Sequence, residues 1–171
     1  MPGHCILSHG LNSSPAARKV TALAQVAQAL GWSCERPDYS EIDASAELRD
    51  IQRRLDRLLD SARVAPGPLV LVGSSMGAYI SALASLQVEV AGLFLMAPPV
   101  ALPGYRQRLD AATVPLQVCH GWHDDLIAAQ DVVDWCRERS APLLLLDDNH
   151  RLEASLETLC DAFARFLKAL T

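Results

Sequence analysis

Residues 68–78 read PLVLVGSSMGA, and this stretch decides the fold class. Residues 68–72 are apolar without a break, which is typical of a strand that helices cover on both faces of a parallel sheet. Residues 73–77 match the pattern Gly-x-Ser-x-Gly, and the apolar residues between 76 and 86 predict a helix immediately afterwards. A buried strand that leads through a tight turn into a helix is a repeating unit of α/β folds.

Strand and helix patterns alternate along the rest of the chain. Further strands are predicted at 5–8, 32–36, 91–96, 116–119 and 143–146. Further helices are predicted between Pro15 and Gly31, along Leu48, Ile51, Leu55, Leu58 and Leu59, and at 130–139 and 152–170. The expected fold is α/β: a doubly wound, mostly parallel six-stranded sheet with helices on both faces, in a single domain covering residues 1–171. Because open parallel sheets bind ligands at the carboxyl ends of their strands, residues just after each strand are the candidate functional residues.

Composition excludes several classes of partner. A hydrophobic fraction of 50% and a charged fraction of 20% indicate a globular chain. The net charge of −5 argues against a nucleic-acid partner, because no basic stripe is present to neutralise phosphates. The basic residues Arg53, Arg54 and Arg57 alternate with acids and are interpreted as the exposed face of a helix.

The sequence also predicts a cellular location. The first residues, MPGHC, contain no basic segment followed by an apolar run, so we expect no signal peptide. Apolar stretches such as 143–146 are far too short to cross a bilayer, so no membrane partner is expected. The five cysteines are scattered and form no Cys-x-x-Cys pair, which favours reduced thiols and a cytoplasmic location.

Ser75 is the candidate nucleophile. It is the central serine of the Gly-x-Ser-x-Gly pattern, in which a sharp strand-to-helix turn lifts the hydroxyl above the sheet. Glycine is needed at 73 and 77 because side chains there would collide with the turn. The neighbouring Ser74 lacks this spacing, and the alternative interpretation of the whole stretch is a flexible connection or an anion cradle. The backbone amide of Met76 is a candidate donor to a developing oxyanion.

A serine hydroxyl needs an adjacent base that an acid orients. His150 follows the predicted strand 143–146 and is the candidate base, although it could also be a solvated loop histidine. Asp124 follows the predicted strand 116–119 and is the candidate acid, with Asp125 as its competitor. Either aspartate could instead cap the next helix.

Other residues at strand ends have secondary roles in this interpretation. The amide of Leu11, after the first strand, is the candidate second donor to the oxyanion. Possible pocket-lining residues are Tyr39, Pro98, Trp122 and His123, although side chains of these types are more often simple packing. A metal site at His120, His123 and Asp124 matches no known ligand spacing, so no metal is expected.

With these residues in place, the chain resembles the α/β-hydrolase superfamily over nearly its whole length. It is similar to the compact bacterial esterase-like members, in which a His-Gly-x-Asn-Ser-Ser-Pro turn follows the first strand; here residues 9–15 read HGLNSSP. Similar proteins carry Gly-Ser-Ser-x-Gly at the serine, His-Gly-x-x-Asp at the acid and Asp-x-x-His at the base. Residues 120–124 read HGWHD, which places the acid at Asp124, and residues 147–150 read DDNH.

The resemblance implies a serine hydrolase that cleaves a small carboxylic ester or thioester without a cofactor. It also implies a minimal fold without a cap domain, because only residues 97–114 are available where caps are usually inserted. We therefore expect a shallow, open site with little selectivity for long acyl chains. Two alternatives stay open: an amidase, peptidase or carbon–carbon hydrolase with the same triad, and a hydrolase-like interaction protein whose triad is idle.

Overall fold

The computed structural model describes residues 2–47 and 49–171, without the side chain of Arg49. Leu48, which the sequence places in the second predicted helix, lies outside the described residues. Six strands form one sheet in the order β2-β1-β3-β4-β5-β6, and every neighbouring pair is parallel. The strands are β1 (His4–Ser8), β2 (Ser33–Glu35), β3 (Leu69–Ser74), β4 (Gly92–Met96), β5 (Leu116–Gly121) and β6 (Leu143–Leu146). The predicted doubly wound parallel sheet is confirmed, and it is fully parallel.

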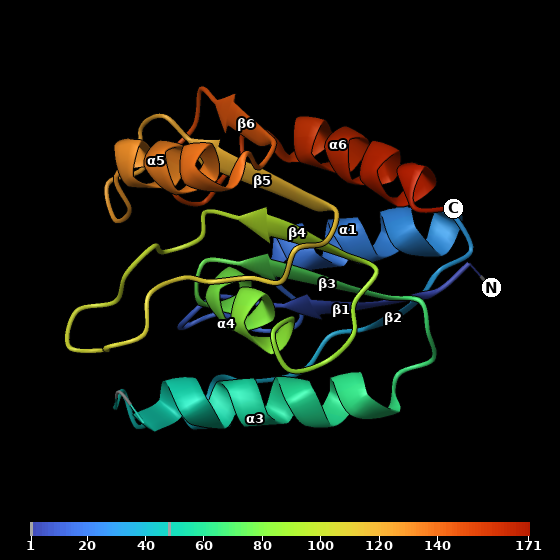
Figure 1. Ribbon diagram of the computed structural model, residues 1–171, viewed down its shortest axis with the longest axis horizontal. Coiled ribbons are helices and arrows are strands. Elements are labelled where there is room, and N and C mark those ends of the chain that lie inside the picture. The colour runs from blue at the N-terminus through green and yellow to red at the C-terminus, as the bar shows by residue number, and fades with distance from the viewer. Residues whose placement is uncertain (1, 48) are drawn as a thin grey trace.

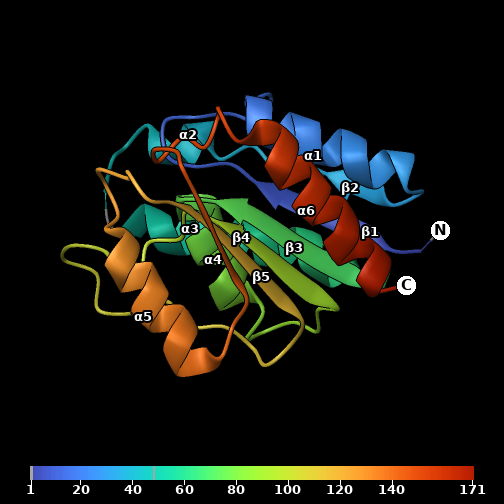
Figure 2. The ribbon, with the colours of Figure 1, turned by 90° about the horizontal axis from the view of Figure 1, so that it is seen from above.

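Helices cover both faces of this sheet, as expected. They are α1 (Arg18–Ala29), α2 (Ser40–Asp43), α3 (Arg49–Val64), α4 (Met76–Ala84), α5 (Ala129–Arg139) and α6 (Leu156–Ala169). Helices α1 and α6 pack on one face, while α3, α4 and α5 pack on the other. Figure 2 shows α1 and α6 side by side across the sheet from α3 and α4. The short α2 was not predicted from the sequence, because one helical turn carries no periodic pattern.

The strand register brings the candidate residues to one end of the sheet. Ser8 pairs with Gly73, and Ser74 pairs with Met96, so the loops after β1, β3 and β4 leave the sheet at nearly the same level. Figure 1 shows all strand arrows pointing the same way, with the C-terminus at the opposite end. The chain turns to different faces after β1 and β3, into α1 and α4, and a parallel sheet is expected to bind ligands at such a switch point between neighbouring strands.

The connection from β4 to β5 departs from the alternation. Residues 97–115 form no helix or strand, and in Figure 1 they extend as a long loop beyond the ends of the strands. Two buried side chains, Val100 and Leu109, anchor this loop, and the Leu109 N–H donates to the Val100 carbonyl at 2.9 Å. The Trp135 indole N–H on α5 donates to the Leu109 carbonyl at 3.0 Å. The expected absence of room for a cap at this position agrees with a loop that folds back onto the domain.

Among the helices of the described chain, none is long and apolar enough to cross a membrane.

Candidate active site

Ser75 lies in the sharp turn between β3 and α4, with φ 53° and ψ −117°. This backbone conformation is strained for a residue that carries a side chain. The Ser75 N–H donates to the carbonyl of Met96 at 2.9 Å, which ties the turn to β4. A Cβ at Gly73 would overlap the carbonyl of Gly77, and a Cβ at Gly77 would overlap the carbonyl of Ser8. The Gly-x-Ser-x-Gly spacing is therefore a steric requirement of this turn.

His150 connects Ser75 to Asp124. Its Nε2 lies 3.0 Å from the Ser75 Oγ, and its Nδ1 lies 2.7 Å from the Asp124 Oδ2. Because a carboxylate oxygen only accepts, Nδ1 carries the proton and Nε2 is left to accept from the Ser75 hydroxyl. The other carboxylate oxygen of Asp124 accepts from the N–H groups of Leu126 and Ile127 at 2.9 and 2.8 Å. The Asp124 side chain is fully buried, so its orientation is fixed from both ends.

The other carboxylates near His150 have different partners. Asp125 is exposed, and the exposed Asp147 accepts a hydrogen bond from His123 at 2.7 Å. Asp148 is buried and accepts from the Ser155 N–H just before α6 at 2.9 Å. Among the described residues, Asp124 is the aspartate whose carboxylate contacts the His150 ring.

His120 and His123 point to separate partners. His120 is fully buried, donates from Nε2 to the Ile127 carbonyl at 3.0 Å, and lies 3.5 Å from the Asp124 carboxylate. Burial lowers the pKa of His120 below its ordinary value of 6.5. His123 is exposed on the far side of the loop. Within residues 2–47 and 49–171, no three histidine, cysteine or acidic side chains are grouped as they would be around a metal ion.

The loop after β1 lies against the nucleophile. A Cβ built on Gly10 would lie 3.5 Å from the Ser75 Cβ, so the loop backbone passes directly beside the serine. Leu11 and Met76, whose amides were the expected oxyanion donors, line the same cavity of about 260 Å³. Met76 is the first residue of α4, and its N–H is therefore one of those without a partner inside the helix. The cavity also touches Asp43, Ile51, Arg54 and Leu102.

Arg54 corrects the interpretation of the basic residues on α3. It was expected on the exposed face, but its side chain is 1% exposed. The guanidinium holds the Asp43 carboxylate through Nε at 2.6 Å and Nη2 at 2.8 Å. It also donates to the carbonyls of His9 and Gly10 at 3.1 and 3.0 Å. Arg54 therefore joins α2, α3 and the loop after β1 beneath the candidate site.

The spacing of apolar residues along α3 indicates that Arg54 is buried. Ile51, Leu55 and Leu58 are buried, and residue 54 belongs to the same face because it lies three residues after 51 and four before 58. Arg53 and Arg57 are exposed, as expected. The expectation that Arg54 is exposed rested on its charge and not on its position on the apolar face of the helix, and it was wrong.

The four possible pocket-lining residues differ in their burial. Tyr39 is fully buried, and its hydroxyl is 2.9 Å from the Ser8 Oγ, so it belongs to the core. Pro98 is buried in the turn after β4, whereas Trp122 and His123 are exposed. None of the four lines the cavity beside Leu11 and Met76. For Tyr39, the burial and the hydrogen bond of its hydroxyl agree with the packing interpretation rather than with a contact to a ligand.

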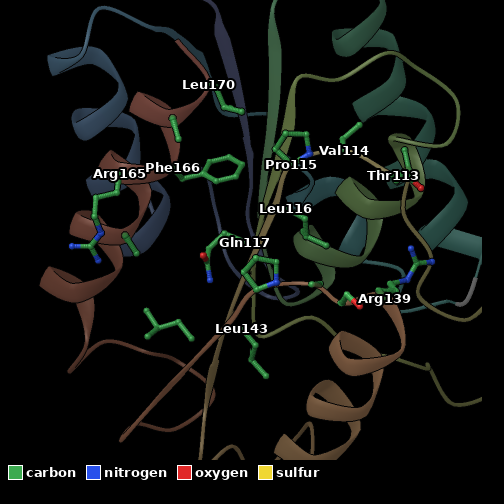
Figure 3. A pocket seen from close by; sticks show the side chains of 17 residues that line it. Thr113, Val114, Pro115, Leu116, Gln117, Arg139, Leu143, Arg165, Phe166 and Leu170 are labelled. Atoms are coloured by element: carbon green, nitrogen blue, oxygen red, sulfur yellow. The ribbon is translucent and has the colours of Figure 1, made fainter.

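A larger hollow of about 920 Å³ lies at the other end of the sheet. It is bordered by the beginnings of β5 and β6 and by α6, as Figure 3 shows with Leu116, Leu143 and Phe166. The carboxyl ends of the strands, where Ser75 and His150 lie, are at the opposite end of the sheet. This hollow is therefore separate from the site around the serine.

The arrangement places a strained serine on a strand-to-helix turn in line with a histidine and a buried carboxylate. The sequence matches the alpha/beta hydrolase family over residues 5–170. A crystal structure of an α/β superfamily hydrolase from Xanthomonas campestris pv. campestris is similar, with 53% identity, a TM-score of 0.94, and coverage of 98% of this chain and 99% of that one. The chain belongs to the alpha/beta hydrolase family, as the resemblance in the sequence predicted.

More distant structures share the fold. A serine hydrolase without a lid from Xanthomonas campestris is 23% identical, with a TM-score of 0.71 and coverage of 98% of this chain and 82% of that one. Est1E from Butyrivibrio proteoclasticus is 17% identical, with a TM-score of 0.78 and coverage of 98% and 88%. The comparison with curated proteins finds no match to the chain.

Proposed function

We propose that the protein is a serine hydrolase that cleaves a small carboxylic ester or thioester through an acyl-enzyme on Ser75. The observation that carries the proposal is the continuous line of contacts from the Ser75 Oγ through His150 to the buried Asp124. An idle site has no need of a serine held in a strained conformation with its hydroxyl 3.0 Å from an imidazole nitrogen.

The reaction proceeds in two acyl transfers. In the first, Nε2 of His150 takes the hydroxyl proton while the Ser75 Oγ bonds to the carbonyl carbon. The tetrahedral oxyanion then collapses, the bond to the leaving alcohol or thiol breaks, and His150 returns the proton to that group. In the second, water attacks the acyl-enzyme with His150 again as base, and the acid leaves with Ser75 restored. Asp124 holds the imidazole in the tautomer that both steps use.

The oxyanion is stabilised by two backbone amides in this proposal, those of Leu11 and Met76. The Met76 amide comes from the first turn of α4, where the helix dipole also favours negative charge. The cavity of about 260 Å³ next to both residues has room for a short acyl or alcohol group. Esters and thioesters are the expected substrates because they are the carboxylic derivatives that transfer their acyl group most easily.

Labelling with a fluorescent fluorophosphonate tests the nucleophile. We expect the parent protein and a Ser74→Ala variant to be labelled, and a Ser75→Ala variant not to be labelled. Ser74 is the matched control because it is the adjacent serine but belongs to β3 and is 6% exposed. Labelling that persists in Ser75→Ala, or a folded parent that is not labelled, would contradict the proposal.

Hydrolysis of p-nitrophenyl acetate, a short-chain acyl thioester and an acyl anilide then separates the reaction classes. We expect turnover of the first two to exceed that of the anilide, and Ser75→Ala to lower turnover to the residual level of triad deletions, about 10³–10⁴ over water. Preferential cleavage of the anilide would assign the protein to the amidases instead.

A further inference from the structure

Two buried side chains hold the peptide bond between Gly10 and Leu11. The Gly10 carbonyl accepts one hydrogen bond from the Arg54 Nη2 at 3.0 Å and one from the His9 Nδ1 at 2.7 Å. A trans peptide is planar, and its N–H points opposite to its C=O. The two donors to the Gly10 carbonyl therefore fix the direction of the Leu11 N–H.

The protonation of His9 is set by its other neighbour. The Tyr39 N–H donates to the His9 Nε2 at 3.0 Å, so this nitrogen has no proton and Nδ1 carries it toward Gly10. His9 is 1% exposed, and burial lowers its pKa below the ordinary 6.5. The imidazole is consequently neutral at physiological pH and keeps this tautomer.

Arg54 makes more contacts than an ion pair with Asp43 alone. Its planar guanidinium holds Asp43 with two nitrogens and lies over the Tyr39 ring, 4.5 Å from the ring centroid. Burying a charged pair is costly, and replacing such a pair by apolar residues is often neutral or stabilising. What an apolar residue could not provide is the pair of hydrogen bonds to the carbonyls of His9 and Gly10.

We propose that Arg54, braced by Asp43, is a positioning residue that aims the Leu11 amide at the oxyanion. The inference rests on the proposed function, because it assigns a task to the amide that this function uses. The Gly10 backbone lies beside the Ser75 side chain, and Leu11 and Met76 line one cavity, so a rotation of this single peptide would turn the Leu11 N–H away from its present direction beside the serine. Arg54 acts on the reaction through Leu11.

An Arg54→Lys variant tests the geometry while keeping the charge beside Asp43. A lysine ammonium is a compact charge without the planar fork, so it cannot serve the carboxylate and both carbonyls together. We expect kcat for p-nitrophenyl acetate to fall about 10²-fold, as for loss of one oxyanion donor, with KM within about twofold. Arg63→Lys is the matched control, since Arg63 is exposed on the same helix and pairs with Asp60; its kcat is expected to equal that of the parent.

A double variant, Arg54→Met with Asp43→Asn, guards against a folding defect. It removes both charges, so no unpaired charge is left buried. We expect a cooperative thermal transition and a loss of kcat similar to that of Arg54→Lys. Parental kcat in either folded variant would overturn the inference and reduce the pair to a structural brace.

A crystal structure of Arg54→Lys gives a readout that does not depend on turnover. A rotated Gly10–Leu11 peptide supports the inference, and an unchanged peptide overturns it. The parent protein separates the two proposals: lack of labelling and turnover in the parent overturns the proposed function, whereas an active parent with an equally active Arg54→Lys variant overturns the inference alone.

Discussion

Both oxygens of the buried Asp124 carboxylate have hydrogen-bond partners in the site. One carboxylate oxygen binds the His150 Nδ1, and the other accepts from two consecutive backbone amides of its own loop. Its neighbour Asp125 is exposed. We expect Asp124→Asn to lower kcat by on the order of 10⁴, because an amide group supports the wrong imidazole tautomer. Asp125→Asn is expected to stay near the parent.

Steady-state hydrolysis of p-nitrophenyl acetate by the two variants checks this prediction. Both substitutions remove one negative charge from the same loop, so a general electrostatic effect would lower both rates equally. An Asp125→Asn variant as impaired as Asp124→Asn would show that the acid is misassigned.

At the same scale, the sequence predicted some of the residues that the structure brings into contact and missed others for definite reasons. Ser75, Asp124 and His150 stand directly after predicted strands, and parallel strands bring such residues to one edge whatever the details of the loops. Asp43 could not be found in this way, because it lies on the single-turn α2 and its role depends on contact with Arg54 eleven residues later. Tyr39 was named as a possible pocket residue or as packing, and only three-dimensional packing shows its hydroxyl bonded to Ser8 inside the core.

At the scale of elements, β4 and β5 are joined by a loop instead of a helix, and a few buried side chains hold this loop in place. Leu109 is 4% exposed and packs in the core with α4 and α5. We expect Leu109→Ala to lower the free energy of unfolding by about 2–4 kcal/mol, through lost burial and the cavity left behind. Urea denaturation followed by circular dichroism measures the change.

Leu126→Ala is the control for this measurement. Leu126 is 73% exposed, so the same substitution there is expected to change stability by about 0.5 kcal/mol or less. Equal effects of the two substitutions would mean that the loop is not anchored through Leu109. The helix boundaries were less predictable than the strands: α6 begins at Leu156 rather than at 152, because Leu152 has a φ of 54°, which a right-handed helix does not allow.

For the whole molecule, buried histidines couple stability to pH. His4, His9 and His120 are each at most 8% exposed, and burial lowers the pKa of all three below 6.5. Below about pH 6.5 the unfolded chain takes up protons that the folded protein excludes, so the free energy of unfolding falls as the pH falls. Above that value these groups have no effect. The slope is at most about 1.4 kcal/mol per pH unit for each histidine.

Urea denaturation at pH 7.5, 6.5 and 5.5 tests this coupling. We expect His4→Gln to make the dependence of stability on pH shallower, because it removes one of the three buried histidines. His4 is suitable for this test because it lies away from the active site, where it hydrogen bonds Ser33. A stability that is constant from pH 7.5 to 5.5 would contradict the assignment.

The sheet supports the two ends of the catalytic contact unequally. Ser75 follows β3, which is fully buried between β1 and β4, whereas His150 follows β6, a half-buried edge strand held by β5 alone among the described strands. Edges of a sheet open at a lower energetic cost than its centre. Release of β6 would part the imidazole from the serine while the remaining strands stay paired. We therefore expect warming to abolish activity before the sheet melts, with the first event at this edge.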